Sequence, residues 1–560
     1  MRSKVSLLIA VGFGFALLLS GCGRNEMEQE FAQWLKQHVE TVKPLEKEAN
    51  LAQWEASTTG HAEAYRRYEE LRLKLSKIYS NRQDFGQLKR WKESGKVRDP
   101  LLARQLTLVY NRYLGNQIDP TLLEQIIRKS TAIEEKFNTF RATLDGRRVP
   151  DNEISKILRT ETDTERRRKA WEASKQIGEV VASDLLELVR LRNQAAESLG
   201  FPNYYVMSLE LDELHLGELQ KIFDELARLT EEPFRELKAE VDTILAKRYG
   251  VSVRELRPWH YQDPFFQEGP QVYEVELDPY YKDHDVKEVA RQYYRSIGLD
   301  VDDILARSDL YEKEGKEQHA FCTDIDREGD VRVLANLRND EYWMNTILHE
   351  LGHGVYDKYI DRSLPYLLRQ PAHTFTTEAV AMFFGRLSRN PAWMQAMLGI
   401  PEKERERIDE TVRKSLRLQQ LVFARWCQVM FRFEQALYEN PDQDLNALWW
   451  DLKERYQLLH RPEGRRKPDW AAKIHFTSAP VYYHNYMLGE MLASQFHFTL
   501  ADKVLKSAET EPSFANDPRI GQFFVDKVFA PGARYRWDEM IRRATGEALS
   551  PRFFVRQFVE

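Results

Sequence analysis

The chain has 560 residues, of which 42% are hydrophobic and 30% are charged, and its net charge is −6. These values are typical of a soluble globular protein, and they give no reason to expect a nucleic-acid-binding surface. The only cysteines are Cys22, Cys322 and Cys427, so the hydrophobic core, not a disulfide framework, must hold the fold together.

The N-terminus predicts an export signal. Two basic residues precede an apolar run at positions 5–19, which is too short for a comfortable membrane span. The run leads to Cys22 in the sequence Leu-Ser-Gly-Cys, which resembles the lipobox of bacterial lipoproteins. That resemblance implies a signal peptide at 1–21, a lipidated linker at 22–30 and attachment to a bacterial membrane, at the periplasmic or outer face. An ordinary signal peptide or a short hydrophobic anchor is the alternative.

Residues 31–560 are predicted to form one mainly helical domain, because charged and apolar residues recur at three- and four-residue spacing and neither a repeat nor a linker interrupts them. Thr162 and Glu165 have the spacing of a capping box. An aromatic loop at 259–266 either lines a cavity or packs in the core. The main helices are expected at 64–77, 122–144, 162–199, 216–249, 402–438 and 445–459.

Two segments of β character, at 318–326 and 330–337, flank Gly329 and predict a small hairpin. The hairpin immediately precedes the helix that carries the first chemical motif. It either braces that helix or offers an edge strand to the backbone of a peptide.

The sequence His349-Glu350-Leu-Gly-His353 fits the motif H-E-x-x-H. On a helix, residues four apart lie on one face, so the two imidazoles can hold one zinc ion. Glu350, beside them, is then the candidate general base. Asn339 or Asp340 is positioned to cap the start of this helix.

A catalytic zinc needs a third protein ligand and an open position for water. Glu378 is the candidate, because it lies in an otherwise apolar helical segment where an unpaired carboxylate would be costly. Pro365 and Pro371 separate this segment from the first helix, so the second helix can fold back onto it. We therefore expect one Zn²⁺ per chain, bound by His349, His353 and Glu378; a salt-bridged core glutamate is the alternative.

This arrangement resembles the gluzincin metallopeptidases. The spacing to Glu378 is similar to that in the angiotensin-converting-enzyme-like peptidyl-dipeptidases and in the thimet oligopeptidase and oligoendopeptidase F family. Downstream, the paired Trp449 and Trp450 and the sequence Ala-Lys-Ile-His ending at His475 are similar to the converting-enzyme pattern. Phe321-Cys322 also fits, and the resemblance extends from about residue 162 to the C-terminus.

The resemblance implies a nearly all-helical ellipsoid with a deep central channel, zinc on the channel floor, and cleavage of short peptides that enter it. His475 and Tyr486 would donate hydrogen bonds to the tetrahedral oxyanion. Lys473 would pair with the C-terminal carboxylate of the peptide, and Tyr483 or Tyr482 would face the same carboxylate. The alternatives are core packing for the tyrosines and an exposed surface position for Lys473.

Several positions depart from the converting-enzyme pattern. Met382 stands where that family has an aspartate that supports a zinc histidine, and Asp357 is a possible substitute. Thr323 replaces a histidine that contacts the substrate backbone, and Asn485 or His484 stands where a chloride-binding arginine would be. These departures concern substrate specificity and chloride dependence and leave the metal chemistry unaffected.

The sequence therefore predicts an exported, lipid-anchored zinc metallopeptidase that acts on short peptides and releases C-terminal dipeptides. One alternative is an oligoendopeptidase that cuts internally in oligopeptides. The other is a non-catalytic zinc-containing binding lipoprotein, and Glu350 and His475 argue against it because binding alone needs neither a base nor an oxyanion donor.

Overall fold

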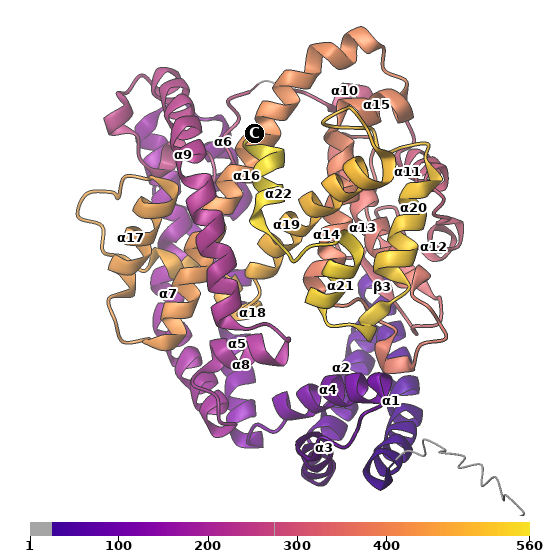
Figure 1. The fold of residues 1–560 in the computed structure, drawn as a ribbon. Coiled ribbons are helices and arrows are strands. Elements are labelled where there is room, and N and C mark those ends of the chain that lie inside the picture. The colour runs from indigo at the N-terminus through magenta and orange to yellow at the C-terminus, as the bar shows by residue number, and fades with distance from the viewer. Residues whose placement is uncertain (1–24, 274) are drawn as a thin grey trace, which may run out of the picture.

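The computed structural model describes residues 25–273 and 275–560 (Figure 1). Helices dominate this part of the chain, and its two sheets have two antiparallel strands each. The predicted mainly helical fold is therefore confirmed. Cys22 and the predicted signal peptide lie outside the described residues. Among the described helices, none combines the length and the apolarity needed to cross a bilayer.

The first four helices form a layer at the lower end of the molecule (Figure 1). They are α1 (Glu26–Thr59), α2 (Ala62–Tyr79), α3 (Arg82–Ser94) and α4 (Pro100–Gly115). The linker predicted at 22–30 is thus helical from Glu26 on. This layer has an apolar cluster of its own, which includes Phe31, Trp91 and Tyr113 and reaches the rest of the molecule at Tyr366.

One half of the body, at the left of Figure 1, is built from long helices. It consists of α5 (Pro120–Thr139), β1 (Ala142–Leu144), β2 (Arg147–Val149), α6 (Asp151–Thr160), α7 (Thr164–Ser198), α8 (Tyr204–Leu211), α9 (Leu216–Tyr249), α16 (Glu402–Glu439) and α17 (Leu445–Gln457). The helices predicted at 216–249, 402–438 and 445–459 are confirmed to within two residues at each end.

Two local predictions in this half are wrong. The helix expected at 122–144 ends at Thr139, and a β1–β2 hairpin follows, because Asp145 and Gly146 adopt positive φ values of 50° and 76° in a tight turn. The capping box is also absent, since Asp163 is the cap of α7 and accepts the backbone N–H of Arg166.

The other half carries the H-E-x-x-H helix and lies at the right of Figure 1. It contains α10 (Asp278–Tyr281), α11 (Val286–Ser296), α12 (Asp302–Arg307), β3 (Phe321–Asp324), β4 (Val331–Leu334), α13 (Glu341–Tyr359), α14 (Thr374–Gly385), α15 (Pro391–Leu398), α20 (Pro518–Phe524) and α21 (Trp537–Thr545). The hairpin predicted before α13 is therefore present, with strands shorter than the β-like segments, and it pairs Phe321 with Leu334. The last helix, α22 (Pro551–Phe558), lies at the centre of the view, beside α16.

Short helical turns connect these elements. The 3₁₀ turns are η1 (Val253–Glu255), η2 (Pro258–His260), η3 (Tyr366–Leu368), η4 (Arg386–Arg389), η5 (Asp469–Ala472) and η8 (Gly532–Arg534), and the π-helical segments are η6 (Thr499–Leu505) and η7 (Val525–Phe529).

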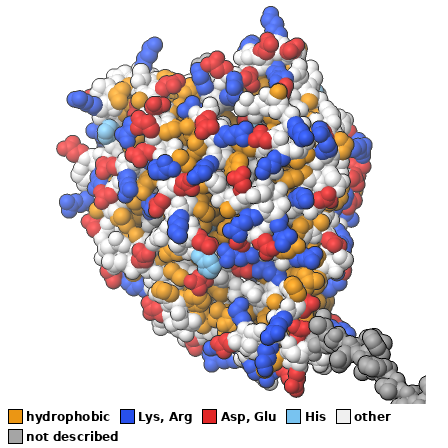
Figure 2. Space-filling view, in the orientation of Figure 1, with side chains coloured by type: hydrophobic (Ala, Val, Ile, Leu, Met, Phe, Trp, Pro, Cys, Tyr) orange, Lys and Arg blue, Asp and Glu red, His pale blue; other side chains and the backbone are white. Residues whose placement is uncertain are grey.

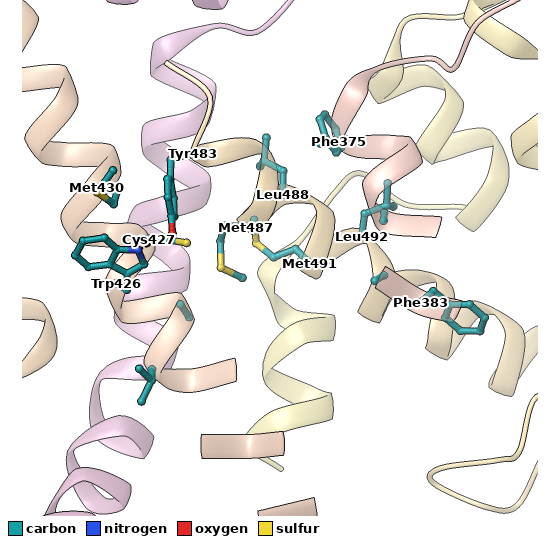
Figure 3. Close-up of a cluster of buried hydrophobic side chains, with 14 of the residues drawn as sticks. Phe375, Phe383, Trp426, Cys427, Met430, Tyr483, Met487, Leu488, Met491 and Leu492 are labelled. Atoms are coloured by element: carbon teal, nitrogen blue, oxygen red, sulfur yellow. Dashed lines mark hydrogen bonds between the residues drawn. The ribbon is translucent and has the colours of Figure 1, made fainter. Parts of the chain in front are cut away.

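The halves meet at α19 (His484–Phe498), which follows the short α18 (His475–Ser478). Most residues of α19 are buried, which explains why its sequence is apolar on nearly all sides. In Figure 3 its side chains Met487, Met491 and Leu492 lie between Trp426 of α16 and Phe383 of α14. The surface, in contrast, intersperses acidic and basic side chains over the face shown in Figure 2.

Candidate active site

Capping side chains set the start of both helices that carry the predicted metal ligands. Asp340, one of the two predicted caps, accepts the backbone N–H of Trp343 at the start of α13. His373 does the same for Phe375 at the start of α14. His349 and His353 therefore lie one turn apart on α13, and Glu378 lies in the second turn of α14.

Two glycines allow the three central helices to approach closely. A Cβ atom on Gly352 of α13 would lie 2.8 Å from the Ala381 Cα atom of α14. A Cβ atom on Gly489 of α19 would lie 3.1 Å from the Met382 sulfur and 3.3 Å from the Glu378 Cβ atom. The small residues are thus required for α14 to present Glu378 to the α13 histidines.

The side chains of His349, His353 and Glu378 converge. The two histidine Nε2 atoms are 3.2 Å apart, and a Glu378 carboxylate oxygen lies 3.8 Å from His349 Nε2 and 4.0 Å from His353 Nε2. Donors of a tetrahedral zinc site with bonds near 2.1 Å are separated by about 3.4 Å. The donor set therefore fits one zinc ion, and among the described residues no lysine or arginine forms a salt bridge with Glu378.

Burial shifts the pKa of each predicted ligand toward the neutral form. It lowers the pKa of His349 to about 4 and that of His353 well below its usual value. It raises the pKa of Glu378 to about 7, and the neighbouring Glu490 carboxylate adds to this rise. Neutral imidazole is the form that binds a metal, and a divalent cation would offset the cost of ionising the buried carboxylate.

A hydrogen bond that the sequence does not reveal orients one ligand. Thr377 Oγ1 lies 2.7 Å from His353 Nδ1, which leaves Nε2 of that ring for the metal. Asp357, the predicted substitute for the missing aspartate, has Asp324 and Arg327 as its charged neighbours. The supporting role predicted for Asp357 is therefore taken by a threonine of α14.

Glu350 is almost fully buried beside the donor set. Burial and, to a smaller extent, the charge of Glu378 raise the pKa of its carboxyl to about 8, against the opposing effect of a backbone hydrogen bond from Cys322 of β3. A basic carboxylate of this kind suits a group that takes a proton from water.

His475 and the three tyrosines form one aromatic group. The His475 ring centroid lies 5.1 Å from that of Tyr483, and the Tyr486 centroid lies 5.3 Å from both Tyr482 and Tyr483. The hydroxyl of Tyr483 accepts the indole N–H of Trp426 at 2.8 Å, so this tyrosine packs toward α16 (Figure 3). Burial raises the pKa of both Tyr482 and Tyr486, and the charge of Glu378 adds to the rise in each.

Lys473 is buried, which rules out the exposed surface position. Its ammonium donates to Gln267 Oε1 at 2.5 Å and lies 5.5 Å from the ring centroid of Tyr483. Burial lowers the pKa of Lys473 to about 8, against the opposing charges of Asp263 and Glu268. Gln267 was not predicted, and the signal available for it was its position directly after the aromatic loop at 259–266.

That aromatic loop packs into the core, since Trp259, His260, Tyr261 and Phe266 are all buried. Only Gln262 of this loop borders one of the larger cavities, which has a volume of about 1320 Å³ and extends to Glu341 at the start of α13. Another cavity, of about 600 Å³, borders Asp212 and Pro480. The deep continuous channel stays a prediction.

The helical fold and the two-histidine, one-glutamate donor set have the arrangement of the gluzincin class of zinc sites. Comparison with known families gives the more particular assignment. The model of peptidase family M3 matches residues 157–560, and the chain belongs to this family. The angiotensin-converting enzyme model matches residues 25–258, so that likeness begins well before the motifs identified in the sequence.

Individual relatives are distant. Carboxypeptidase 1 of Bacillus subtilis (strain 168) is 25% identical over 300 residues, which are 48% of this chain and 56% of that protein. The angiotensin-converting enzyme-related protein of Drosophila melanogaster is 22% identical over 41% of this chain and 38% of its own length. An inactive angiotensin-converting enzyme-related protein of Caenorhabditis elegans is 23% identical over 34% of this chain and 22% of its own. The chain thus spans about half, or less, of the relatives it matches.

Proposed function

We propose that this chain hydrolyses peptide bonds in short peptides with the help of zinc and releases dipeptides from their C-termini. The observation that carries the proposal is the convergence of His349, His353 and Glu378 at donor distances that suit zinc. The buried Lys473, in the same aromatic group as His475, supports the C-terminal specificity.

When bound, zinc would polarise the scissile carbonyl and lower the pKa of the attacking water. Glu350 accepts the proton of that water and later delivers it to the amine leaving group. His475 and Tyr486 donate hydrogen bonds to the oxygen that becomes negative as the carbonyl carbon turns tetrahedral. Tyr482 is the alternative donor, because it too lies close enough to Glu378 to be affected by its charge.

The C-terminal specificity is assigned to Lys473 and Gln267. A carboxylate that reaches Lys473 gains an ion pair in a buried environment, where such a pair is strong. Gln267 Oε1 already accepts from the ammonium, so the amide nitrogen of Gln267 is available to donate to the same ligand. Anchoring the peptide by its free carboxylate would fix how far from the end the cut occurs.

The test compares a short peptide with its C-terminally amidated twin. We expect the free acid to be cleaved with a much lower KM, and dipeptides to be the first products. Equal cleavage of both peptides contradicts the role of Lys473 but leaves the hydrolytic metal site intact.

A second candidate is internal cleavage of oligopeptides. It is favoured by the match to peptidase family M3, which includes the whole donor set, whereas the converting-enzyme match ends before it. The name of the Bacillus relative, carboxypeptidase, fits action at the C-terminus instead. Mapping the first products of a decapeptide separates the two, because internal cleavage yields mid-length fragments.

We further propose that the protein is exported and held at a bacterial membrane by a lipid on Cys22. The support is the lipobox-like sequence. Because α1 begins at Glu26, the anchor would hold the N-terminal helical layer close to the membrane.

A further inference from the structure

The segment from His475 to the start of α19, residues 475–483, leads to both predicted oxyanion donors, and we call it the donor loop. His475 begins α18, and Tyr486 lies in the first turn of α19. His475 Nδ1 is buried and has no hydrogen-bond partner within residues 25–273 and 275–560. The ring is therefore oriented by the backbone that carries it and by its contact with the Tyr483 ring. The position of the donor loop thus decides where the donors point.

One side of α16 contacts the donor loop. Trp426, Glu434 and Tyr438 follow one another at intervals of eight and four residues, so they lie toward the same side of this helix. The Trp426 indole donates to the Tyr483 hydroxyl at 2.8 Å, and Figure 3 shows the two side chains beside each other. The Glu434 carboxylate accepts the backbone N–H of Val481 at 2.8 Å.

Val481 has an unusual backbone conformation. Its φ is 55°, in the left-handed region, which a β-branched residue rarely adopts because its side chain crowds the backbone there. Strain of this kind persists only where the surrounding structure holds it, and it concentrates at functional sites. The Val481 side chain is buried in the core, and the hydrogen bond to Glu434 holds its backbone.

Core packing alone does not explain a glutamate at position 434. The Glu434 side chain is buried, and within the described part of the chain no lysine or arginine forms a salt bridge with it. Burial raises the pKa of Glu434 to about 8, against the opposing effects of the Val481 N–H and the Arg192 charge. A buried carboxyl without a salt bridge costs stability, so its hydrogen bond to the donor loop is the contact that gives it a use.

Arg192 of α7 holds the other end of the donor loop. Its buried guanidinium donates to the backbone oxygens of Phe476 and Thr477 at 2.9 and 2.7 Å, and to the Tyr438 hydroxyl at 3.1 Å. These two carbonyl groups directly follow His475 in α18. A planar guanidinium that contacts two carbonyls fixes a backbone more firmly than a flexible ammonium does. Helices α7 and α16 therefore hold the donor loop at both ends.

We propose that Glu434 and Arg192 are positioning residues that fix the backbone of the donor loop. They hold Val481 in its left-handed conformation and thereby set where His475 and Tyr486 point. This inference rests on the proposed function, because it concerns the donors to the oxyanion. A displacement of about 1 Å in such groups costs roughly 100-fold in rate. A loosened loop should lower kcat with little change in KM, since these hydrogen bonds form in the transition state.

The first experiment measures steady-state kinetics on a short free-acid peptide. Glu434→Leu removes the acceptor and should lower kcat at least tenfold, with KM within threefold of the parent and zinc content unchanged. Glu434→Gln keeps an oxygen that accepts the Val481 N–H and should retain kcat within threefold. Arg192→Lys keeps the charge but not the planar contact with two carbonyls, and should also lower kcat at least tenfold. Parent-like kcat in Glu434→Leu or Arg192→Lys overturns the role of that residue.

A second substitution separates positioning from general stability. Glycine enters the left-handed region without the cost of a Cβ atom, so Val481→Gly lets the turn form without Glu434. Added to Glu434→Leu, it should restore kcat at least threefold. Glu28→Leu is the matched control, because Glu28 is also buried and accepts the backbone N–H groups of Arg98 and Asp99 at 2.7 and 3.0 Å. No recovery in the double variant, or an equal loss of kcat in Glu28→Leu, overturns the proposal.

Amide hydrogen exchange gives a readout that needs no activity. In Glu434→Leu the amides of residues 478–483 should exchange at least tenfold faster than in the parent, whereas Glu434→Gln and Glu28→Leu should match the parent over this segment. Unchanged exchange in Glu434→Leu overturns the proposal. An inactive parent with the expected exchange pattern would refute the peptidase function and leave the hold on the loop intact, so the two failures are distinguishable.

Discussion

The hydrogen bond between Thr377 and His353 makes the role of the second helix in metal binding testable. Thr377→Val keeps the shape of the side chain and removes the oxygen that lies 2.7 Å from His353 Nδ1. When Nε2 binds a metal, Nδ1 carries the proton and donates it, so valine leaves a buried donor without an acceptor. An unsatisfied buried donor costs about 1–3 kcal/mol.

This cost raises the free energy of the zinc-bound protein and therefore weakens zinc binding. In the parent, the bond to Thr377 favours the tautomer whose Nε2 is free, and in the variant this preference is lost. A loss of about 1.4–2.7 kcal/mol corresponds to a zinc dissociation constant about 10- to 100-fold higher, the range found when partners of metal-ligating histidines are removed.

The assay is competition between the metal-free protein and a chelator of known zinc affinity, followed by zinc content after dialysis. Thr243→Val is the matched control, because its hydroxyl bonds only to the backbone oxygen of Ala239 on the exposed side of α9. A zinc affinity in Thr377→Val within twofold of the parent would refute the reasoning. A similar loss in Thr243→Val would show that the effect is general destabilisation.

Further substitutions test the other assignments. Glu350→Gln should retain zinc and lower kcat by at least about 100-fold, because the base is lost while the ligands stay; stoichiometric zinc with undiminished turnover would contradict this role. Lys473→Met should raise KM for free-acid peptides about tenfold and leave amidated peptides unaffected. Because the pKa of Lys473 is lowered to about 8, the lysine is charged below this pH, and KM for free-acid peptides should rise as pH increases through about 8 to 9; a flat profile would show that this charge is not used. Gly489→Ala places a Cβ atom 3.1 Å from the Met382 sulfur, so we expect about 1–3 kcal/mol lower stability by denaturant unfolding and weaker zinc binding; an unchanged midpoint would mean that α19 adjusts freely. Cys22→Ser should move the protein from the detergent phase to the aqueous phase in detergent partitioning, and identical partitioning would argue against a lipid on that thiol.

Local sequence determined many of the helices. The bounds of α9 follow from its leucine periodicity and from Gly250, which ends the helix in the left-handed region at φ 65°. The β1–β2 hairpin was missed because its three-residue strands are too short for a clear alternation, although Asp145-Gly146 carries the turn signal. Spacing along a helix likewise determined the pairing of His349 with His353, since only one turn separates them.

Contacts between distant segments were decided by the tertiary structure alone. Thr377 and His353 are 24 residues apart, Arg386 and Glu490 are 104 apart, and Gln267 and Lys473 are 206 apart. A threonine, a glutamate and a glutamine have many uses in a helical protein, and only the packing of helix on helix assigns these roles.

The three tyrosines show the same division. The sequence places Tyr482, Tyr483 and Tyr486 within one stretch after His475, and any of them suits either the core or the active site. The tertiary structure adds that the hydroxyl of Tyr483 accepts the indole N–H of Trp426 on α16, a partner that the sequence does not reveal. Residue types and the helical period therefore determined which chemistry the chain carries. The packing of α13, α14, α16 and α19 decided which side chains meet, because contact between two side chains depends on residues that are far apart in the sequence and fill the same space.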